Sequence, residues 1–464
     1  MWLRHASRSI SCPQGGSVVP VRTGLITAFL LVAAASVRTQ PEAPGSGGSF
    51  DVKHYAVEID LDVSGGTIAG RERIELTVRE PATPLVFDSG ALVVDSVETA
   101  GAAVPFVQRA RRLIVTLPRP SRPGDTIGLA IAYHGAPTNG LTLLAASAQA
   151  YTTFSTSQWM VAVDGPSDRA TLDLAVSMPA GWRAAGSGRD TGNRTVNGRT
   201  ITTWRQDREV PTFTFGFVAG AFTEANASRD RLALRYLGRG FSEAELQTVF
   251  RDTPAMAGFF EERAGVPYPG ESYAQALVAT SAGQELAGLS HLSEAYGRAV
   301  LADATATSLI AHELAHQWWG ILVTNREWTH FWLNEGFATY MAAAYKEHVR
   351  GRDIYLADVE GWRRRVERIR DAGGEKPLVF PDWNRPTADD RALVYQKGAL
   401  VLHELRAALG DAAFWNAIRD YTREYAGRSV TTGDFQRAVE RSSGRRLDSF
   451  FDQWVYLRQP VPAR

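Results

Sequence analysis

The chain of 464 residues contains one cysteine, Cys12, so it cannot form a disulfide bond within itself. Its 50 basic and 50 acidic side chains cancel, which excludes the strong positive field typical of nucleic-acid-binding proteins. It also lacks an uninterrupted apolar stretch of about 20 residues, the length that a membrane-spanning helix needs. We therefore expect no nucleic-acid partner. We also expect no stable membrane span in the chain that remains once the N-terminal signal, described next, has been removed.

The N-terminus has the order of features found in a secretory signal. Arg4, Arg8 and Arg22 precede a short apolar run at residues 25–32, and small residues follow it. This layout predicts a signal peptide over residues 1–35 and a location outside the cell or in the periplasm or cell envelope. An uncleaved N-terminal anchor is the alternative, because it begins with the same pattern.

A region rich in strands is predicted after the signal. Residues 36–49 are rich in Pro, Gly and Ser and are interpreted as a linker. Beyond them, apolar and polar residues alternate, which predicts half-buried antiparallel strands. The apolar positions are Tyr55, Val57, Ile59, Leu61, Val63, Ile74, Leu76 and Val78. Asn197 and Gly198 form a typical two-residue hairpin turn. We predict a β domain over residues 50–228.

The pattern changes to helical spacing from about residue 241. The apolar residues Val359, Trp362, Val366 and Ile369, for example, recur every three or four positions, as on one face of a helix. We predict a mostly helical domain over residues 229–464, with one short strand at 273–279. The expected fold class is therefore α+β, a β domain followed by a helical domain.

Residues 310–320, IAHELAHQWWG, contain the strongest chemical signal in the chain. His312 and His316 are four positions apart, so on a helix both can direct a ring nitrogen at one metal ion. Glu313 lies one residue round from the first histidine and can reach a water bound to that ion as a general base. Gly320 is expected to end this helix.

A third ligand is available in WLNEGFATY. After a connection over residues 321–331, Glu335 lies early in a second predicted helix. It can complete a set of two histidines and one glutamate with an open fourth position, which is typical of catalytic zinc. We predict one Zn²⁺ ion held by His312, His316 and Glu335, although cobalt or manganese can occupy the same kind of site.

Several stretches together resemble one enzyme family. HELAHQWWG, WLNEGFATY and VYQKGA, with VDGPSDRAT at 163–171 and GVPYPGESYAQALV at 265–278, resemble the aminopeptidase N-like gluzincins of peptidase family M1, in a short two-domain form. The resemblance implies a saddle-like β domain followed by a thermolysin-like catalytic domain.

The resemblance also implies roles for individual residues. His312, His316 and Glu335 match the zinc ligands, and Glu313 matches the base that activates the zinc-bound water. Tyr395, in VYQKGA, matches the tyrosine that stabilises the tetrahedral oxyanion. A phenol and a metal directed at that oxygen form an oxyanion hole.

The chain departs from the family at the substrate amine. The family binds the free α-amine with the glutamate of a Gly-x-Met-Glu-Asn motif, and SAGQELAGL places Glu285 at that position. Gln284 and Leu286 then stand where the family has Met and Asn. Gln158 is the one candidate for a second contact from the β domain, and we assign it no role. Because larger relatives have further domains that cap the site, we expect a more open cleft here.

Three functions are compatible with these residues. The leading interpretation is a zinc aminopeptidase that removes N-terminal residues from peptides. An endopeptidase, or another zinc hydrolase, is the alternative, because the amine-binding motif is altered. A non-catalytic peptide-binding module is the third, and the complete set of ligands, base and tyrosine argues against it. The sequence leaves the oligomeric state and the preferred substrate residue open.

Overall fold

The computed structural model describes residues 48–81, 84–280, 283–382 and 386–457. The predicted signal peptide and most of the predicted linker lie outside these residues. Within the described ranges, no helix is both long and apolar enough to cross a bilayer.

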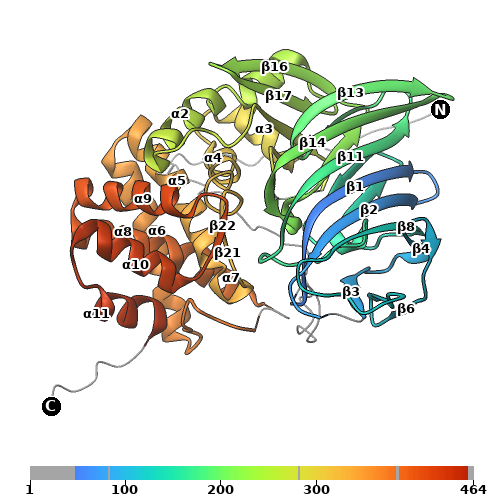
Figure 1. Ribbon diagram of the computed structural model, residues 1–464. Coiled ribbons are helices and arrows are strands. Elements are labelled where there is room, and N and C mark those ends of the chain that lie inside the picture. The colour runs from blue at the N-terminus through green and yellow to red at the C-terminus, as the bar shows by residue number, and fades with distance from the viewer. Residues whose placement is uncertain (1–47, 82–83, 281–282, 383–385, 458–464) are drawn as a thin grey trace, which may run out of the picture. The chain divides into compact units, whose positions relative to one another are not determined.

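The first half of the described chain is built from strands (Figure 1). Its largest sheet has the strand order β13-β14-β11-β1-β2-β8-β4-β5. These strands are β1 (Phe50–Asp62), β2 (Thr67–Val78), β4 (Val93–Thr99), β5 (Ala102–Ala103), β8 (Thr126–Gly135), β11 (Arg169–Pro179), β13 (Arg189–Val196) and β14 (Arg199–Pro211). A three-stranded sheet has the order β3 (Leu85–Asp88), β7 (Arg112–Val115) and β6 (Phe106–Arg109). A four-stranded sheet has the order β12 (Arg183–Gly186), β15 (Phe217–Gly220), β10 (Gln149–Thr152) and β9 (Leu141–Leu144).

The predicted alternation is confirmed in β1 and β2, which pair antiparallel. Tyr55, Val57 and Ile59 are at most 2% exposed, whereas the intervening Glu58 is exposed. The hairpin between β13 and β14 turns at Asn197 and Gly198, both with positive φ. The parallel pairing of β1 with β11 was not predicted, because periodicity shows that a segment is a strand but not which strand it pairs with.

Asp168, next to the start of β11, is expected to make the stability of this fold depend on pH. It is 6% exposed, and its Oδ2 has no hydrogen-bond partner among the described residues. Burial, and then the charge of Asp51, raise the pKa of Asp168 to about 7. In an unfolded chain the pKa of aspartate is about 3.9, so between about pH 4 and 7 only the unfolded state releases this proton. The contribution of Asp168 to the free energy of unfolding therefore falls as pH rises through this window.

We expect Asp168→Asn to remove that loss. Relative to the unchanged chain, its free energy of unfolding, measured in urea, should increase from pH 4.5 to pH 7, so the variant becomes the relatively more stable protein. Asp173→Asn is the matched control, because hydrogen bonds from Arg205 of 2.7 and 2.9 Å lower the pKa of Asp173. Its effect on stability therefore changes with pH only below about pH 4, and it should show no such rise between pH 4.5 and pH 7. A difference between Asp168→Asn and the unchanged chain that does not vary with pH would show that Asp168 is ionised throughout.

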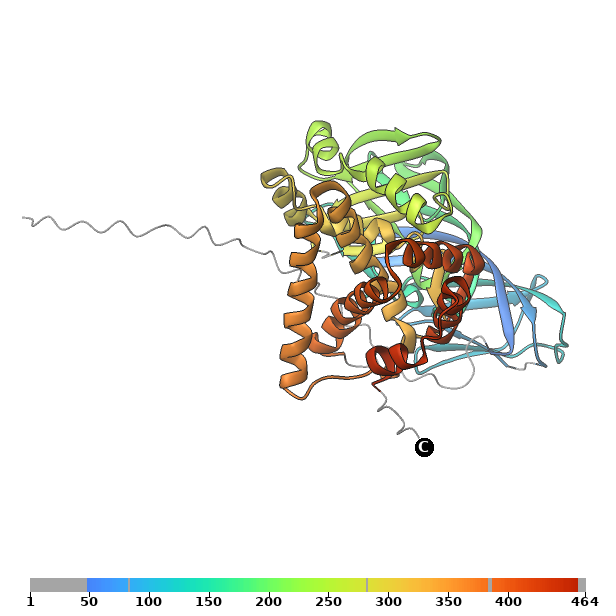
Figure 2. The same ribbon diagram turned by 90° about the vertical axis from the view of Figure 1, so that its left-hand side faces the viewer.

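The second half combines a five-stranded sheet with helices. The sheet has the order β16 (Thr223–Arg229), β17 (Leu232–Gly238), β18 (Ser272–Val278), β20 (Leu289–Ser293) and β19 (Gly283–Leu286). The helices are α1 (Glu243–Val249), α2 (Thr253–Ala264), α3 (Glu294–Ala302), α4 (Ser308–Ala315), α5 (Trp332–Arg350), α6 (Arg352–Asp371), α7 (Ala388–Ala392), α8 (Gly398–Leu409), α9 (Asp411–Tyr425), α10 (Thr432–Ser443) and α11 (Asp448–Phe451). Figure 2 shows α6 as the long orange helix beside the red helices.

The helical half contains more strand than the sequence pattern indicated. The strand expected at 273–279 is β18, but β16, β17, β19 and β20 were not predicted. The predicted domain division at residue 228 falls within β16, which pairs with β17, and the division itself stays a prediction. The helical spacing of Val359, Trp362, Val366 and Ile369 is confirmed, because all four are buried on one face of α6.

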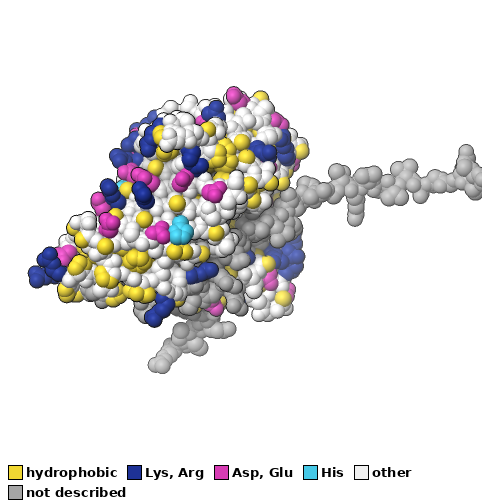
Figure 3. Space-filling model, turned by 90° about the vertical axis from the view of Figure 1, so that its right-hand side faces the viewer, with side chains coloured by type: hydrophobic (Ala, Val, Ile, Leu, Met, Phe, Trp, Pro, Cys, Tyr) yellow, Lys and Arg dark blue, Asp and Glu magenta, His cyan; other side chains and the backbone are white. Residues whose placement is uncertain are grey.

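The charge balance of the sequence is visible on the surface. On the face drawn in Figure 3, Lys and Arg side chains are interspersed with Asp and Glu side chains, and no large area has one sign of charge.

Candidate metal centre

The two histidines of the motif lie at the C-terminal end of α4. His312 is in its last turn, and His316 is the residue that follows the helix, with helical φ and ψ of −58° and −22°. Their ring centroids are 4.8 Å apart, and their Nε2 atoms are 3.1 Å apart. The spacing of four residues therefore brings both nitrogens to one point.

Glu335 adds a third donor from the first turn of α5, which packs against α4. Its Oε2 is 3.2 Å from His312 Nε2 and 3.4 Å from His316 Nε2. In a tetrahedral zinc site with bonds of about 2.0–2.1 Å, neighbouring donor atoms lie about 3.4 Å apart. The donor triangle, with edges of 3.1 to 3.4 Å, therefore has the size that such an ion requires.

The proton of His316 is placed by the turn that follows it. His316 Nδ1 lies 3.0 Å from the carbonyl oxygen of Trp319, which can only accept, so Nδ1 donates, and Nε2 can bind a metal ion in place of a second proton. Gly320 has a φ of +137°, and a Cβ there would lie 2.8 Å from His316 Nδ1. The expectation that Gly320 ends the helix was wrong: α4 ends at Ala315, and Gly320 makes room for the His316 ring.

The cluster is strongly acidic. Glu285, Glu313 and Glu335 are 3%, 5% and 1% exposed, and the ring of His316 lies among them. Burial lowers the pKa of His316, but the attraction of Glu335 and then Glu285 outweighs burial and raises it to about 10. Buried like charges are costly unless a cation compensates them, so the charge and the donor types both fit a divalent metal ion.

Glu313 lies beside the donor triangle and is not part of it. With Glu285 and His316 it forms a second group, in which one donor atom from each residue lies within 4.8 Å of the others. A Cβ at Gly283 would collide with Glu313 Oε1, so a larger residue there would displace this carboxylate. Burial raises the pKa of Glu313 well above its ordinary value, against the opposing charge of His316.

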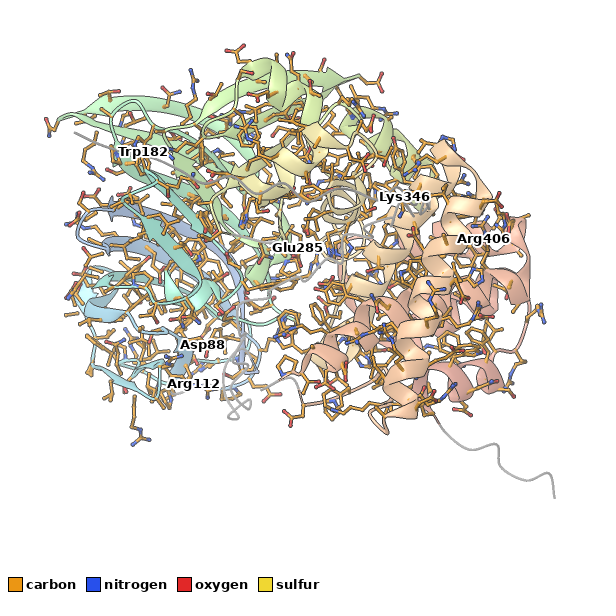
Figure 4. The ribbon with its side chains drawn as sticks, turned by 180° about the vertical axis from the view of Figure 1, so that it is seen from behind. Asp88, Arg112, Trp182, Glu285, Lys346 and Arg406 are labelled. Atoms are coloured by element: carbon orange, nitrogen blue, oxygen red, sulfur yellow. The ribbon has the colours of Figure 1, made fainter. Side chains whose placement is uncertain are left out.

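Glu285 reaches the same centre from β19. Strand β19 belongs to the five-stranded sheet, and Figure 4 labels Glu285 well away from Arg406, which lies on α8. Its Oε2 accepts a hydrogen bond of 2.7 Å from Gln284 Nε2, and its Oε1 has no partner among the described residues. Burial raises the pKa of Glu285 to about 7, although His316 opposes the shift. The structure thus places Glu285 beside Glu313.

Tyr395 completes the set of predicted residues. It lies in the π-helix η4 (Leu393–Lys397), a kind of turn that is frequent at functional sites. Its ring is parallel to that of His312, with 8° between the planes and 5.8 Å between the centroids. Burial, and then the charge of Glu335, raise the pKa of Tyr395 well above its ordinary value. The phenol therefore keeps its proton and can donate a hydrogen bond.

Gln317 is a residue of the site that the sequence analysis missed. It is 1% exposed, its Nε2 donates to the carbonyl oxygen of Leu286 at 3.0 Å, and its Oε1 accepts from Gly288 N at 3.0 Å. These bonds tie the strand that carries Glu285 to the turn that follows α4. The available signal was a polar side chain inside an apolar stretch, since a buried amide needs partners.

Arg169 was also missed. It is 8% exposed, and its Nη2 donates to the carbonyl oxygens of Ile321 and Leu322, at 3.1 and 3.4 Å. Burial lowers the pKa of Arg169 to about 10, so the side chain remains charged at neutral pH. The guanidinium therefore connects β11 to the segment after His316, a contact between residues far apart in sequence.

The fold and the donor cluster define a metalloprotein with a buried centre of two histidines and one glutamate. Comparison with known proteins shows which metalloprotein family the chain resembles. Residues 253–454 match the family described as the peptidase family M1 domain. Aminopeptidase N of Streptomyces lividans is 25% identical over 450 residues, which cover 90% of this chain and 51% of that protein. Aminopeptidase N of Lactococcus lactis subsp. lactis is 35% identical over 162 residues, which cover 33% and 18%.

Solved structures agree with the sequence relatives. The M1 zinc metallopeptidase of Deinococcus radiodurans has a TM-score of 0.76 at 29% identity, over 90% of this chain and 96% of that chain. A mutant M1 zinc metallopeptidase from the same organism, bound to a Tyr-Ser-Ala substrate, has a TM-score of 0.77 at 28% identity over the same shares.

Residues 253–454 form a peptidase family M1 domain, and the relatives and solved structures support an aminopeptidase N-like M1 protein. The predicted family and the predicted α+β fold class are thereby confirmed. The chain spans about half the length of the Streptomyces relative, at 51%, and much less of the Lactococcus relative, at 18%. The roles of the individual site residues stay predictions.

Proposed function

We propose that this chain is a zinc-dependent aminopeptidase that hydrolyses the first peptide bond of a peptide. The observation that carries the proposal is the position of His316, whose ring belongs both to the donor triangle and to the group that contains Glu313 and Glu285. Metal ligands, a base and an amine-binding carboxylate therefore lie within one cluster. The M1 relatives named above support the same activity.

The metal would be held by His312, His316 and Glu335, whose donor atoms have the types and spacing that Zn²⁺ prefers. When bound, Zn²⁺ supplies a Lewis acid that lowers the pKa of a water and polarises a carbonyl group.

Glu313 is assigned the proton transfers. Its carboxylate accepts a proton from the attacking water and later delivers that proton to the nitrogen of the leaving peptide. A carboxylate whose pKa is raised by burial is a stronger base, once ionised, than an exposed one. Gly283 leaves the space that this carboxylate occupies.

Tyr395 is assigned the stabilisation of negative charge. Attack on the peptide carbonyl places that charge on oxygen, and a phenol that retains its proton can donate a hydrogen bond to it. The raised pKa of Tyr395 and its position against the His312 ring fit this role.

Glu285 is assigned the substrate's α-ammonium group. A charge-assisted hydrogen bond between them holds the N-terminus of the peptide in place. The first peptide bond, one residue further along the substrate, then lies at the base. The free Oε1 favours this role, because a buried carboxylate oxygen without a partner is costly and an ammonium group would satisfy it. An endopeptidase has no use for such an anchor, so the geometry favours removal of single N-terminal residues.

The amine anchor is tested by Glu285→Ala with a pair of substrates, an aminoacyl amide and the same compound with an acetylated amine. We expect kcat/KM for the free amine to fall about 10- to 100-fold, since a hydrogen bond to a charged group is lost. The acetylated compound should be a poor substrate for both proteins. Glu271→Ala, at an exposed glutamate just before β18, is the matched control and should change neither value. Equal cleavage of both compounds by the unchanged chain would favour the endopeptidase.

The remaining expectations from the sequence concern location and partners. We propose that the enzyme acts on peptides outside the cell or in the cell envelope, supported by the signal-like order of residues 1–35. Tryptic mapping of the N-terminus of the mature protein tests this: cleavage near residue 35 is expected, and an intact N-terminus would favour the uncleaved anchor.

A further inference from the structure

Gln284 is the immediate neighbour of Glu285 on β19, at the edge of the five-stranded sheet. Its side chain is 1% exposed and turns towards that neighbour. The amide nitrogen Nε2 donates to the carboxylate atom Glu285 Oε2 at 2.7 Å and to the carbonyl oxygen of Glu285 at 3.0 Å. One side chain thus holds both the backbone and the carboxylate of the residue assigned to the substrate amine.

Two acceptor atoms beside this hydrogen bond are free. Gln284 Oε1 and Glu285 Oε1 are both buried, and neither has a hydrogen-bond partner among the described residues. Each free oxygen is attached to the same carbon as one partner of the 2.7 Å bond, so the two oxygens belong to one local group. Buried acceptors without partners are rare and costly, and they point to a donor that the site is built to receive.

The location of the pair indicates which donor this is. The carboxylate of Glu285 lies close to the carboxylate of Glu313 and the ring of His316. One donor atom of each residue is within 4.8 Å of the other two. A donor entering here meets several carboxylates, so a cation is favoured over a neutral amide or hydroxyl group. An ammonium group is such a cation, and it has three N–H donors, more than one carboxylate oxygen can use.

We infer that Gln284 is the second half of the amine-recognition site: its Nε2 fixes the Glu285 carboxylate, and its Oε1 accepts a hydrogen bond from the substrate's α-ammonium group. Glu285 Oε1 accepts a second one. This inference rests on the proposed aminopeptidase function and names the residue that adds selectivity for a free amine. A neutral amide is suited to this position, because another carboxylate would add to a surplus of buried negative charge.

Other contacts keep the two residues in place. Gln317, from the turn after α4, bonds to Leu286 and Gly288 on the far side of Glu285. The strand is thus anchored independently of Gln284. Loss of the Gln284 amide should therefore affect recognition of the amine and leave the position of β19 and the metal ligands unchanged.

Gln284→Met tests the inference, because methionine has a similar length and stands at this position in the family motif. The protein is loaded with zinc and carries Glu313→Gln, so that ligands are bound and not cleaved. Calorimetry then compares leucinamide with 4-methylpentanamide, which differs from it in lacking the amine. We expect Gln284→Met to weaken leucinamide binding about tenfold and to leave 4-methylpentanamide binding within about twofold, since one charge-assisted hydrogen bond is lost.

A matched control is available in the same sheet. Gln275 on β18 is also buried, but its free atom among the described residues is the amide nitrogen Nε2, and its Oε1 accepts from Thr253. Gln275→Met should leave the ratio of the two affinities unchanged. If Gln284→Met does not fold, Gln284→Asn, whose amide is one methylene short of both contacts, should lower the same ratio.

The outcomes separate the inference from the function on which it rests. A selective loss for leucinamide supports the inference. An unchanged affinity ratio, or equal losses for both ligands, overturns it and makes Gln284 a packing residue. If the protein with Gln284 intact binds both ligands equally, the amine anchor itself is absent, and the aminopeptidase proposal fails with it.

Discussion

Glu313→Gln is expected to lower kcat by about 10²–10⁴-fold, the usual contribution of a general base. Glutamine has nearly the same shape, so it can occupy the space that Gly283 leaves beside Glu313. It cannot accept and return a proton as a carboxylate does. The affinity for zinc should change little, because Glu313 lies outside the triangle formed by His312, His316 and Glu335. Stopped assays of aminoacyl amide hydrolysis, with zinc content measured on the same samples, check both statements.

An exposed glutamate provides the control for this substitution. Glu262→Gln, on the outer side of α2, makes the same chemical change and should leave kcat unaltered. If Glu313→Gln loses zinc along with activity, Glu313 is a ligand and the assignment of roles within the motif is incorrect. If kcat is unchanged, the proton is transferred by another group.

His316→Ala is expected to remove both the metal and the turnover. His316 Nε2 lies 3.1 Å from His312 Nε2 and 3.4 Å from Glu335 Oε2, so it forms one corner of the donor triangle. Changing residues that only support a ligand already lowers metal affinity about 10- to 100-fold, so losing a ligand should exceed that range. Competition with a chromophoric chelator measures the affinity.

The same variant should also lose thermal stability in the presence of zinc. Without a firmly held cation, three buried carboxylates remain close together, and their repulsion favours unfolding. His403→Ala is the control, because His403 bonds to Tyr355 on α6, outside the cluster. Full zinc occupancy in His316→Ala would show that the metal is held by other residues.

The parts of the site that could be predicted from sequence are those set by local geometry or by resemblance. The spacing of His312 and His316 is sufficient to predict that both rings lie on the same side of one helix and can reach a common point. Glu335 could be placed early in a helix by pattern, but its pairing with the histidines depends on how α4 packs on α5. Tyr395 was identified only through its resemblance to a family motif, since no periodicity connects it to α4.

The contacts that hold the site together could not be predicted in this way. Gly283, Gln317 and Arg169 act through residues distant in sequence, and a single chain gives no pairing information for them. The end of α4 was misplaced for a related reason. Glycine is a residue type that often ends a helix, but Gly320 lies beyond the end of α4 at Ala315, where its lack of a Cβ leaves room for the His316 ring.

The same distinction applies to the fold. Alternation identified β1 and β2, because each has one buried and one exposed face. Strands β18, β19 and β20 are buried on both faces, so only the apolar run at β18 indicated a strand. Strand β19, which carries Gln284 and Glu285, was among those missed.

The central claim is that one zinc ion in this cluster supports cleavage at a free N-terminus. The most direct measurement is a titration of the metal-depleted chain with zinc, while hydrolysis of an aminoacyl amide and its N-acetylated counterpart is followed in parallel. The account predicts no turnover without metal and a rise that ends at one zinc per chain, for the free amine alone. Turnover in the metal-depleted chain, or an equal rise for both compounds, would contradict it.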